Sequence, residues 1–306
     1  MNQTNPQRPS SPKQFWAIVP AAGVGTRMQA DRPKQYLELL GKTLIEHSVQ
    51  RLLDVPDITG VVIALDKQDT VWSQLHFTHS KPVLITNGGK ERCHSVLNAL
   101  RHLEQTLAQA PSPLMGRAER GGRSRWGGGD NSINGFAIDT PHPNPLPQRE
   151  REGNSSLFPG ERATEEVWVL VHDAARPCVR AEDLTRLIKD ASQDDHGGLL
   201  ALPVRDTMKR QTPDGHVEVT VDRNGLWHAM TPQMFKLSLL IKALNNALEK
   251  KLHVTDDASA MELAGYHPLL VACHEDNIKI TRPFDLTLAT LYMQQQNIQQ
   301  KTASKS

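Results

Sequence analysis

Five short apolar runs, separated by segments of helical character, constrain the fold of this chain more than any other feature. The runs are almost continuously apolar, which is typical of strands that are buried on both faces of a sheet. We predict strands at residues 15–20, 60–65, 82–86, 167–171 and 199–204. Strands of this kind that alternate with helices form a mostly parallel sheet with helices on both faces. The chain is therefore predicted to have a doubly wound, Rossmann-like α/β fold.

Amphipathic helices are predicted between the runs. In residues 91–108, one helical stripe carries Val96, Leu100, Leu103 and Leu107. Other helices are predicted at residues 43–53, 182–190 and 283–299, with a capped helix start at 254–258. Residues 277–282 are predicted as a last strand, with Lys279 near the ends of other strands. Because ligands bind beyond the carboxyl ends of the strands in this fold, the loops there are candidate sites.

The loop after the first predicted strand has the character of a phosphate-binding loop. Its glycines, Gly23 and Gly25, allow backbone N–H groups to approach an anion closely. Arg27 and Lys34 add two positive charges. The loop is not a dinucleotide fingerprint, because Met28 stands where the third glycine is required, and it is not a Walker loop. A tight strand-to-helix turn is the alternative interpretation.

Two other strand ends carry polar residues. Residues 87–92 contain two glycines at a helix N-terminus, where Gly89 can approach an anion or the edge of a base and Ser95 can hydrogen-bond the base. A plain helix-start turn explains this stretch equally well. Asp173 follows the fourth strand and can hold a ribose hydroxyl or a hydrated Mg²⁺, unless it is a helix N-cap. The adjacent His172 is given no role.

Residues 204–232 are predicted to form a projecting β-hairpin arm around a Pro-Asp-Gly turn. The arm has little apolar content and carries four cations, Arg205, Lys209, Arg210 and Arg223. A hairpin with so few core residues is not stable alone, so we expect it to pack on a second subunit in a homodimer. An ordinary polar edge hairpin is the alternative.

Residues 111–165 do not fit the α/β pattern. They contain 9 glycines and 7 prolines in 55 residues, a level that indicates low complexity. A domain linker or a partner-binding arm is one interpretation. A tolerated surface insertion is favoured, because the helix before it and the strand after it belong to one predicted sheet. We therefore predict a single domain over residues 15–299, with tails at residues 1–14 (polar and disordered) and 300–306.

Composition excludes several classes of protein. The formal net charge of +1 gives no overall field for nucleic acid or a membrane surface. No apolar run approaches the roughly 18 residues of a membrane span. The three cysteines, Cys93, Cys178 and Cys273, are far apart and form no disulfide framework. We therefore expect a cytoplasmic protein with no nucleic acid or membrane partner.

These motifs, in this order, resemble the 2-C-methyl-D-erythritol 4-phosphate cytidylyltransferase family. The matching stretches lie at residues 20–27, 33–35, 88–96, 171–177, 205–210, 221–227, 231–233, 255–257 and 277–279. The resemblance covers about residues 15–110 and 166–299. It implies a nucleotidyltransferase that moves CMP from CTP to the phosphate of methylerythritol 4-phosphate and releases pyrophosphate. It also implies Mg²⁺ or another divalent cation with CTP, although it names no metal ligands.

The resemblance assigns roles residue by residue. Arg27 and Lys34 would stabilise charge on the α-phosphorus, and Arg223 and Lys279 would position the attacking phosphate. Asp173 and Ala174 would face the ribose. The nucleotide pocket would be lined by Ala21, Ala22, Gly23, Gly25, Gly89 and Ser95. The substrate would also lie near Thr207, Thr231 and Thr255. In the family the hairpin reaches the partner's site, so Thr207 and Arg223 would act in trans.

Two residues depart from the family pattern, and two alternative functions remain open. His94 stands where an acidic residue is usual, and Lys90 where acidic or small residues are common. Both could alter recognition of the base. The alternatives are a cytidylyltransferase for another polyol phosphate, such as ribitol 5-phosphate, and a catalytically silent nucleotide-binding regulator.

Overall fold

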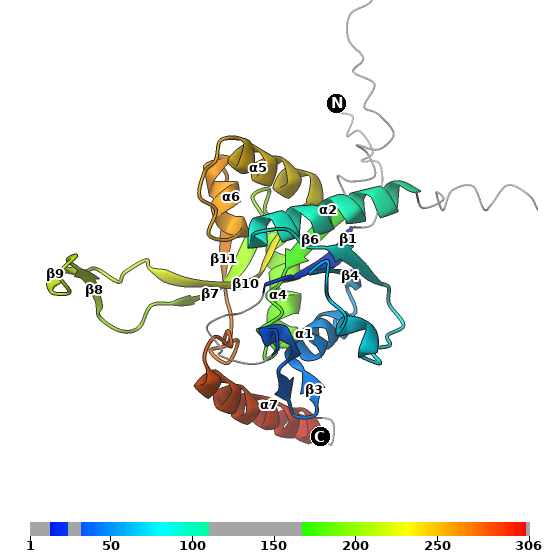
Figure 1. The fold of residues 1–306 in the computed structure, drawn as a ribbon. Helices are drawn as coiled ribbons and strands as arrows, with labels where there is room; N and C mark the ends of the chain where they lie inside the picture. Colours follow the sequence, from blue (N-terminus) through cyan, green and yellow to red (C-terminus); the bar gives the residue numbers. More distant parts are fainter. Residues whose placement is uncertain (1–12, 24–31, 110–166, 304–306) are drawn as a thin grey trace, which may run out of the picture.

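A seven-stranded sheet forms the centre of the molecule in the computed structural model, which describes residues 13–23, 32–109 and 167–303 (Figure 1). In spatial order the strands are β11 (Leu269–Ala272), β7 (Gly198–Pro203), β10 (Trp227–Lys236), β6 (Val167–Val171), β1 (Gln14–Ala21), β4 (Ile58–Leu65) and β5 (Val83–Asn87). Only β10 among them runs antiparallel to its neighbours; all other pairs are parallel. The predicted mostly parallel α/β fold is confirmed.

Helices cover both faces of the sheet. They are α1 (Leu44–Leu53), α2 (Arg92–Gln109), α4 (Ala181–Ala191), α5 (Leu237–Glu249), α6 (Asp257–Leu263) and α7 (Pro283–Ala303). Successive side chains of β1 point to opposite faces of the sheet, and each face packs against its own layer of helices. Ala17 and Val19 pack with α1 and α4, whereas Trp16 and Ile18 pack with α2, α5 and α6. Helix α7 packs outside these layers, in a separate cluster with Leu44 of α1.

Four short elements come between β1 and β5 in the sequence. They are the 3-10 helices η2 (Lys34–Tyr36) and η3 (Trp72–Gln74) and the two-residue strands β2 (Glu38–Leu39) and β3 (Lys42–Thr43). The Thr43 hydroxyl accepts from the Glu46 backbone, and Glu46 reaches back to Thr43, so a capping box begins α1. Asp256 forms the equivalent cap of α6, as the sequence predicted. The predicted stripe of α2 is buried at Val96, Leu100 and Leu103.

The segment predicted as a last strand, residues 277–282, is not a strand. The final strand of the sheet is β11, and the later segment instead crosses the carboxyl ends of the strands. The Ile280 N–H donates to the Ala175 carbonyl at 2.9 Å, and the Asn277 side chain donates to the Thr231 carbonyl at 2.9 Å. Backbone groups that bond to these loops are not available for a ladder. The crossing nevertheless brings Lys279 to the strand ends.

The arm is present as a two-stranded hairpin of β8 (Met208–Gln211) and β9 (Val217–Val221) that extends away from the body (Figure 1). Every residue of β8 is exposed, as are all but one of β9. The hairpin turn contains Gly215 at φ +94°, which a side chain would strain. The sequence placed residues after Trp227 in the arm, but β10 carries them back into the central sheet between β7 and β6.

Several predicted segments lie outside the described residues. These are most of the tail 1–14, the whole insertion 111–165 and the loop that contains Gly25 and Arg27, and they stay predictions. At the other end, α7 continues to Ala303, four residues past the predicted end of the helix. In the described part of the chain, no helix combines the length and apolar character needed to cross a membrane.

Candidate functional site

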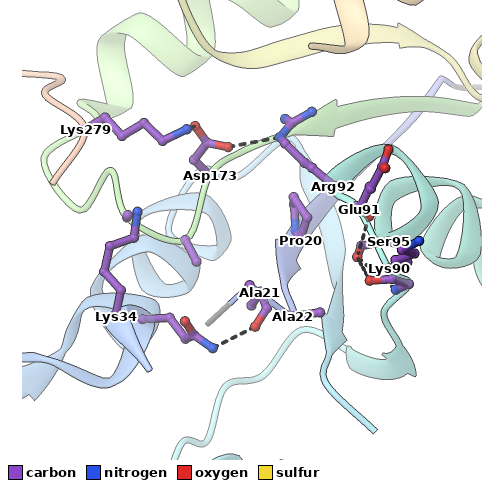
Figure 2. A pocket seen from close by; sticks show the side chains of 15 residues that line it. Pro20, Ala21, Ala22, Lys34, Lys90, Glu91, Arg92, Ser95, Asp173 and Lys279 are labelled. Carbon is purple, nitrogen blue, oxygen red and sulfur yellow. Dashed lines mark hydrogen bonds and ion pairs between the residues drawn. The ribbon is translucent and has the colours of Figure 1, made fainter. Parts of the chain in front are cut away.

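A pocket of about 260 Å³ lies where the carboxyl ends of β1, β5 and β6 meet (Figure 2). This is the edge at which a parallel sheet exposes its loops, and where the sequence predicted a site. The lining comes from five separate segments of the chain. Its residues are Pro20, Ala21, Ala22, Gly23, Lys34, Gln35, Gly89, Lys90, Glu91, Arg92, Ser95, Asp173, Ala174, Ala175 and Lys279.

The end of β1 supplies a wall with almost no side chains. A Cβ added at Gly23 would meet nothing within 4 Å, so its missing side chain leaves room in the pocket. The buried Gln35 donates its side-chain N–H to the Ala21 carbonyl at 2.8 Å and thereby ties η2 to this strand end. That bond holds the neighbouring Lys34 at the pocket wall. Arg27 lies outside the described residues.

The start of α2 supplies the second wall, built on a glycine pair. A Cβ at Gly88 would lie 2.3 Å from the Ala22 side chain, and one at Gly89 would lie 2.4 Å from that of His94. Both positions therefore require glycine for the loop to close on β1 and α2. The buried Ser95 hydroxyl accepts from the Gly89 N–H at 3.0 Å and lies 3.2 Å from the Glu91 carbonyl. Ser95 thus shapes the loop as well as lining the pocket.

Asp173, at the end of β6, is the centre of the charged groups. Figure 2 shows it between Lys279 and Arg92. The Lys279 Nζ lies 2.8 Å from one carboxylate oxygen, and the Arg92 Nε lies 3.3 Å from the other. The Arg176 Nε is 3.6 Å from the oxygen that Lys279 contacts. Three cations therefore surround one buried carboxylate.

This arrangement fixes the protonation states of the pair Asp173 and Arg92. Burial opposes ionisation of Asp173, but Arg92 and Lys279 outweigh it and hold the pKa of the carboxyl well below its usual range. Burial likewise opposes the charge of Arg92, but Asp257 and Asp173 hold its pKa above the usual value. Arg92 Nη2 contacts the fully buried Asp257 at 2.8 Å, although burial raises the pKa of that carboxyl. Arg92 thus bridges β6 and α6.

A neutral histidine supports Asp173 from behind. The buried His172 ring contacts the Arg176 carbonyl through Nε2 at 3.1 Å, so Nε2 carries the proton and Nδ1 accepts from the Thr231 hydroxyl. The Thr231 oxygen in turn accepts the Asp173 backbone N–H at 3.1 Å. Burial lowers the pKa of His172 to about 4. His172 is therefore a satisfied core residue, in agreement with the absence of any assigned role.

The structure brings together most, but not all, of the predicted site residues. The pocket is lined by Ala21, Ala22, Gly23, Lys34, Gly89, Ser95, Asp173, Ala174 and Lys279. Thr231 is buried behind Asp173 rather than open to the pocket. Thr255 is exposed next to the N-cap of α6. Thr207 and Arg223 are exposed on the arm, where the Arg223 guanidinium donates to the Arg205 carbonyl.

Sequence reasoning missed four residues that organise the pocket. They are Gln35, Arg92, Arg176 and Asp257. Each stands inside a motif that was singled out. Arg92 and Asp257 are partners far apart along the chain, whereas Gln35 bonds to Ala21 and Arg176 contacts Asp173, three residues before it. An arginine at the start of α2 and an acidic residue at the start of α6 were the only local signals. Neither signal identifies the other residue as its partner.

The charges that line the pocket favour an anionic ligand. Four cationic side chains, Lys34, Lys90, Arg92 and Lys279, face two carboxylates, Glu91 and Asp173. Converging cations beside a side-chain-free backbone loop suit a polyphosphate.

Comparison with known protein families gives one matching model. It is the model of 2-C-methyl-D-erythritol 4-phosphate cytidylyltransferase, and it matches residues 15–110 and 152–295. The match passes over residues 111–151, which lie within the predicted insertion.

Curated relatives and solved structures agree with this model. The 2-C-methyl-D-erythritol 4-phosphate cytidylyltransferase of Aliivibrio fischeri is 40% identical over 93% of this chain and 96% of its own length. That of Pseudomonas syringae is 41% identical over 89% of this chain and 92% of its own length. The crystal structure of the Francisella tularensis cytidylyltransferase of this name superposes with a TM-score of 0.62 at 29% identity, covering 91% of this chain and 99% of that one. A crystal structure of a 4-diphosphocytidyl-2C-methyl-D-erythritol synthase gives 0.65 at 29% identity, with coverages of 92% and 99%.

Proposed function

The chain belongs to the 2-C-methyl-D-erythritol 4-phosphate cytidylyltransferase family, and we propose that the pocket at the strand ends is its active site. The protein is a nucleotidyltransferase. It moves CMP from CTP onto the phosphate of methylerythritol 4-phosphate, giving 4-diphosphocytidyl-2-C-methyl-D-erythritol and pyrophosphate. The observation that carries the proposal is the pocket itself, where four cations and a bare backbone loop converge.

The chemistry requires charge neutralisation more than proton transfer. The attacking phosphate is already an anion, so the reaction needs no general base. Two anions must be brought together, and negative charge must be stabilised as the α-phosphorus becomes pentacoordinate. Lys34 lines the pocket beside the β1 loop and is assigned this role. Arg27, which lies outside the described residues, is assigned to stabilise the same negative charge.

The nucleotide is assigned to the walls formed by β1 and α2. Small residues in both loops let backbone groups approach the phosphates and the base. This set comprises Ala21, Ala22, Gly23, Gly25, Gly89 and Ser95. Asp173 and Ala174 are assigned to the ribose side. Because Asp173 stays ionised, its carboxylate is an acceptor for a substrate hydroxyl.

Lys279 and Arg223 are assigned to the attacking phosphate. Lys279 is held at the pocket by its ion pair with Asp173, and an incoming phosphate would compete with that carboxylate for the ammonium group. Thr231 is buried and Thr255 is exposed, and neither is among the residues that line the pocket. We retain them as neighbours of the substrate site, with Thr231 acting through Asp173.

The arm is proposed to complete the site of a second subunit. Thr207 and Arg223 lie on exposed arm segments and not in the pocket of their own chain. Val217 and Val219 of the arm are 64% and 48% exposed, which indicates a surface that another subunit covers. We therefore propose a homodimer through residues 204–232, in which Thr207 and Arg223 act in trans.

A divalent cation fits the donor set of the pocket. Asp173 is held ionised there and offers a carboxylate. Mg²⁺ is typically held by one or two carboxylates together with substrate phosphates, whose charge it neutralises. We propose Mg²⁺ or another divalent cation with CTP. The cysteines Cys93, Cys178 and Cys273 are free, and we propose a cytoplasmic location for the enzyme.

Pyrophosphate release from CTP tests the function directly. We expect rapid release with methylerythritol 4-phosphate and much slower release with ribitol 5-phosphate. A preference for ribitol 5-phosphate would identify a different polyol as substrate. Nucleotide binding without release on either substrate would identify a silent regulator. Retention of Lys34 and Lys279 at the pocket argues against that alternative.

A further inference from the structure

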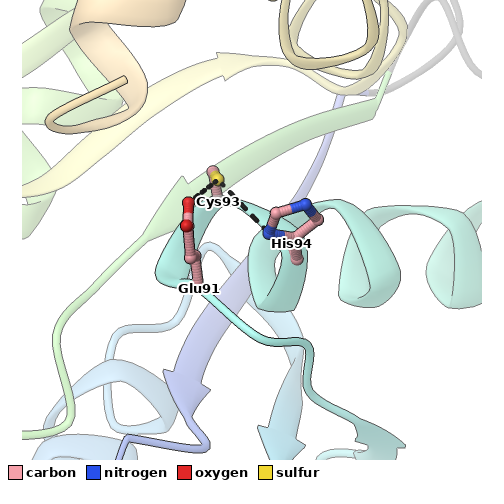
Figure 3. A group of neighbouring side chains, drawn as sticks. All are labelled: Glu91, Cys93 and His94. Carbon is pink, nitrogen blue, oxygen red and sulfur yellow. Dashed lines mark hydrogen bonds between the residues drawn. The ribbon is translucent and has the colours of Figure 1, made fainter. Parts of the chain in front are cut away.

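We propose that Glu91, Cys93 and His94, at the start of α2, form a binding site for Zn²⁺. Figure 3 shows the Cys93 sulfur between the Glu91 carboxylate and the His94 ring. Each residue offers one ligand atom, and the three atoms lie within 4.8 Å of one another. In the described part of the chain this is the one such group of three.

The distances suit a zinc ion. The Cys93 Sγ lies 3.8 Å from Glu91 Oε2 and 3.7 Å from His94 Nδ1. Ligand atoms of a tetrahedral zinc site, with Zn–S near 2.3 Å and Zn–N or Zn–O near 2.1 Å, are about 3.3–3.6 Å apart. The Glu91 and His94 ligand atoms lie within 4.8 Å of each other, so side-chain shifts of up to about 1 Å bring all three atoms onto one ion.

The chemistry of the donors selects the ion. A thiolate, an imidazole and a carboxylate together are typical zinc ligands, whereas Mg²⁺ prefers oxygen donors throughout. The site is therefore separate from any Mg²⁺ that accompanies the nucleotide. On binding, the thiol proton is lost to solvent, a Zn–S bond forms and the ion stays divalent. Three protein ligands leave a fourth position for water.

The surroundings hold the ligands in place. Cys93 is buried, and it packs with the helices on its face of the sheet. A Cβ added at Gly89 would lie 2.4 Å from His94 Cβ, so the Gly89 backbone packs closely on the base of the His94 side chain. Glu91 is exposed and lines the pocket. The site therefore has a buried sulfur ligand and an open side toward solvent.

Cobalt titration of the full-length chain tests the proposal without any measurement of activity. Chelator-treated protein is titrated with Co²⁺ in excess Mg²⁺, with a phosphine in place of a thiol reductant. We expect one Co²⁺ per chain, a near-ultraviolet absorption from thiolate-to-cobalt charge transfer, and loss of that band when Zn²⁺ is added. The variants Cys93→Ala and His94→Asn should each lower the affinity on the order of 10–100-fold or more.

Matched variants separate this site from other thiols and imidazoles. Cys273→Ser removes another cysteine, and His102→Asn removes a second histidine of α2; both should keep the band and the affinity. The proposal is overturned if no thiolate band appears, if Cys93→Ala retains it, or if Mg²⁺ displaces Co²⁺. Should Cys93→Ala fail to fold, His94→Asn and the exposed Glu91→Gln decide the matter by the same titration.

Discussion

The pocket and the arm both carry cationic side chains, but the two regions hold them in opposite ways. In the pocket, Asp173 is 11% exposed at its side chain and is paired with Arg92, Arg176 and Lys279. On the arm, the strands β8 and β9 lie almost wholly at the surface. The ion pair between Arg205 and Glu275 joins side chains that are 71% and 59% exposed.

This difference shows what each region can do alone. Charges held by buried partners at the ends of strands are already positioned, and a substrate need not order them. Exposed charges on a thin hairpin have no such support from their own chain. In the proposed homodimer, the pocket would receive Thr207 and Arg223 from the arm of a second copy of the chain.

The largest expected effect on stability comes from Asp173→Asn. The substitution keeps the shape of the side chain but leaves three cations without their shared anion. Breaking a buried ion pair in this way typically costs about 3–5 kcal/mol. Urea unfolding measures the loss. Asp214→Asn, at the exposed turn of the arm, is the control and should leave the unfolding midpoint almost unchanged. If the two substitutions lowered the unfolding midpoint equally, charges in the pocket and on the arm would not differ in their contribution to stability.

The next largest effect is on catalysis. Lys34→Ala should lower kcat by about 10²–10³, the usual cost of one electrostatic contact to a transition state. Arg27→Ala, outside the described residues, should do the same. Steady-state pyrophosphate release measures kcat, and circular dichroism should show an intact fold. Lys242→Ala, an exposed lysine on α5, is the matched control. Near-normal turnover of Lys34→Ala would refute its assignment.

The assignment of the arm can be tested by mixing two inactive variants. Lys34→Ala damages the pocket and Arg223→Ala damages the arm, so we expect little activity from either alone. In a mixed dimer that shares arms, one site combines both lesions and the other has neither. Coexpression in equal amounts should therefore restore about a quarter of wild-type activity. No recovery in confirmed mixed dimers would mean that Arg223 acts within its own chain.

The elements that the sequence could predict are those with a local signal. The five strands predicted from the sequence are apolar along most of their length, and the caps at Thr43 and Asp256 need only neighbouring residues. The segment 277–282 misled because Ile278 and Ile280 alternate with polar residues. In the structure those residues pack against α7, and the backbone bonds to loops instead of a strand.

The charged centre of the pocket could be predicted only in part. Asp173 and Lys279 stand in recognisable motifs, and both reach the pocket. The role of Arg92 depends on carboxylates 81 and 165 residues further along the chain, and no local pattern encodes such a pairing. The antiparallel entry of β10 between β6 and β7 was missed for the same reason.

A smaller effect on stability is expected from pH. It acts through His172, which supports Asp173 by way of Thr231. The folded-state pKa of His172 is lowered to about 4, so between pH 6.5 and 4 the unfolded chain binds more protons than the native one. Stability should therefore fall as the pH drops through this window, by up to about 1.4 kcal/mol per pH unit. Urea unfolding at several pH values measures the slope. His172→Gln should reduce it, and an unchanged slope would contradict this origin.

The smallest effect is expected from deleting residues 112–163, which belong to neither the pocket nor the arm. Residues 112–163 lie outside the described residues, and the family model passes over most of them. Because each doubling of loop length costs only about 0.6 kcal/mol of loop-closure entropy, deleting them should change stability by no more than about 2 kcal/mol. Activity should also persist, since the pocket is lined by segments on either side and the arm lies beyond.

The control for this deletion replaces residues 112–163 with a glycine–serine linker of the same length, which separates loss of sequence from loss of length. If both variants fold but lose turnover, the segment contributes residues to the site, and pocket and arm together are not the whole catalytic unit. If only the deletion loses turnover, the segment acts as a spacer between α2 and β6. Full activity of both would leave catalysis to the two regions alone.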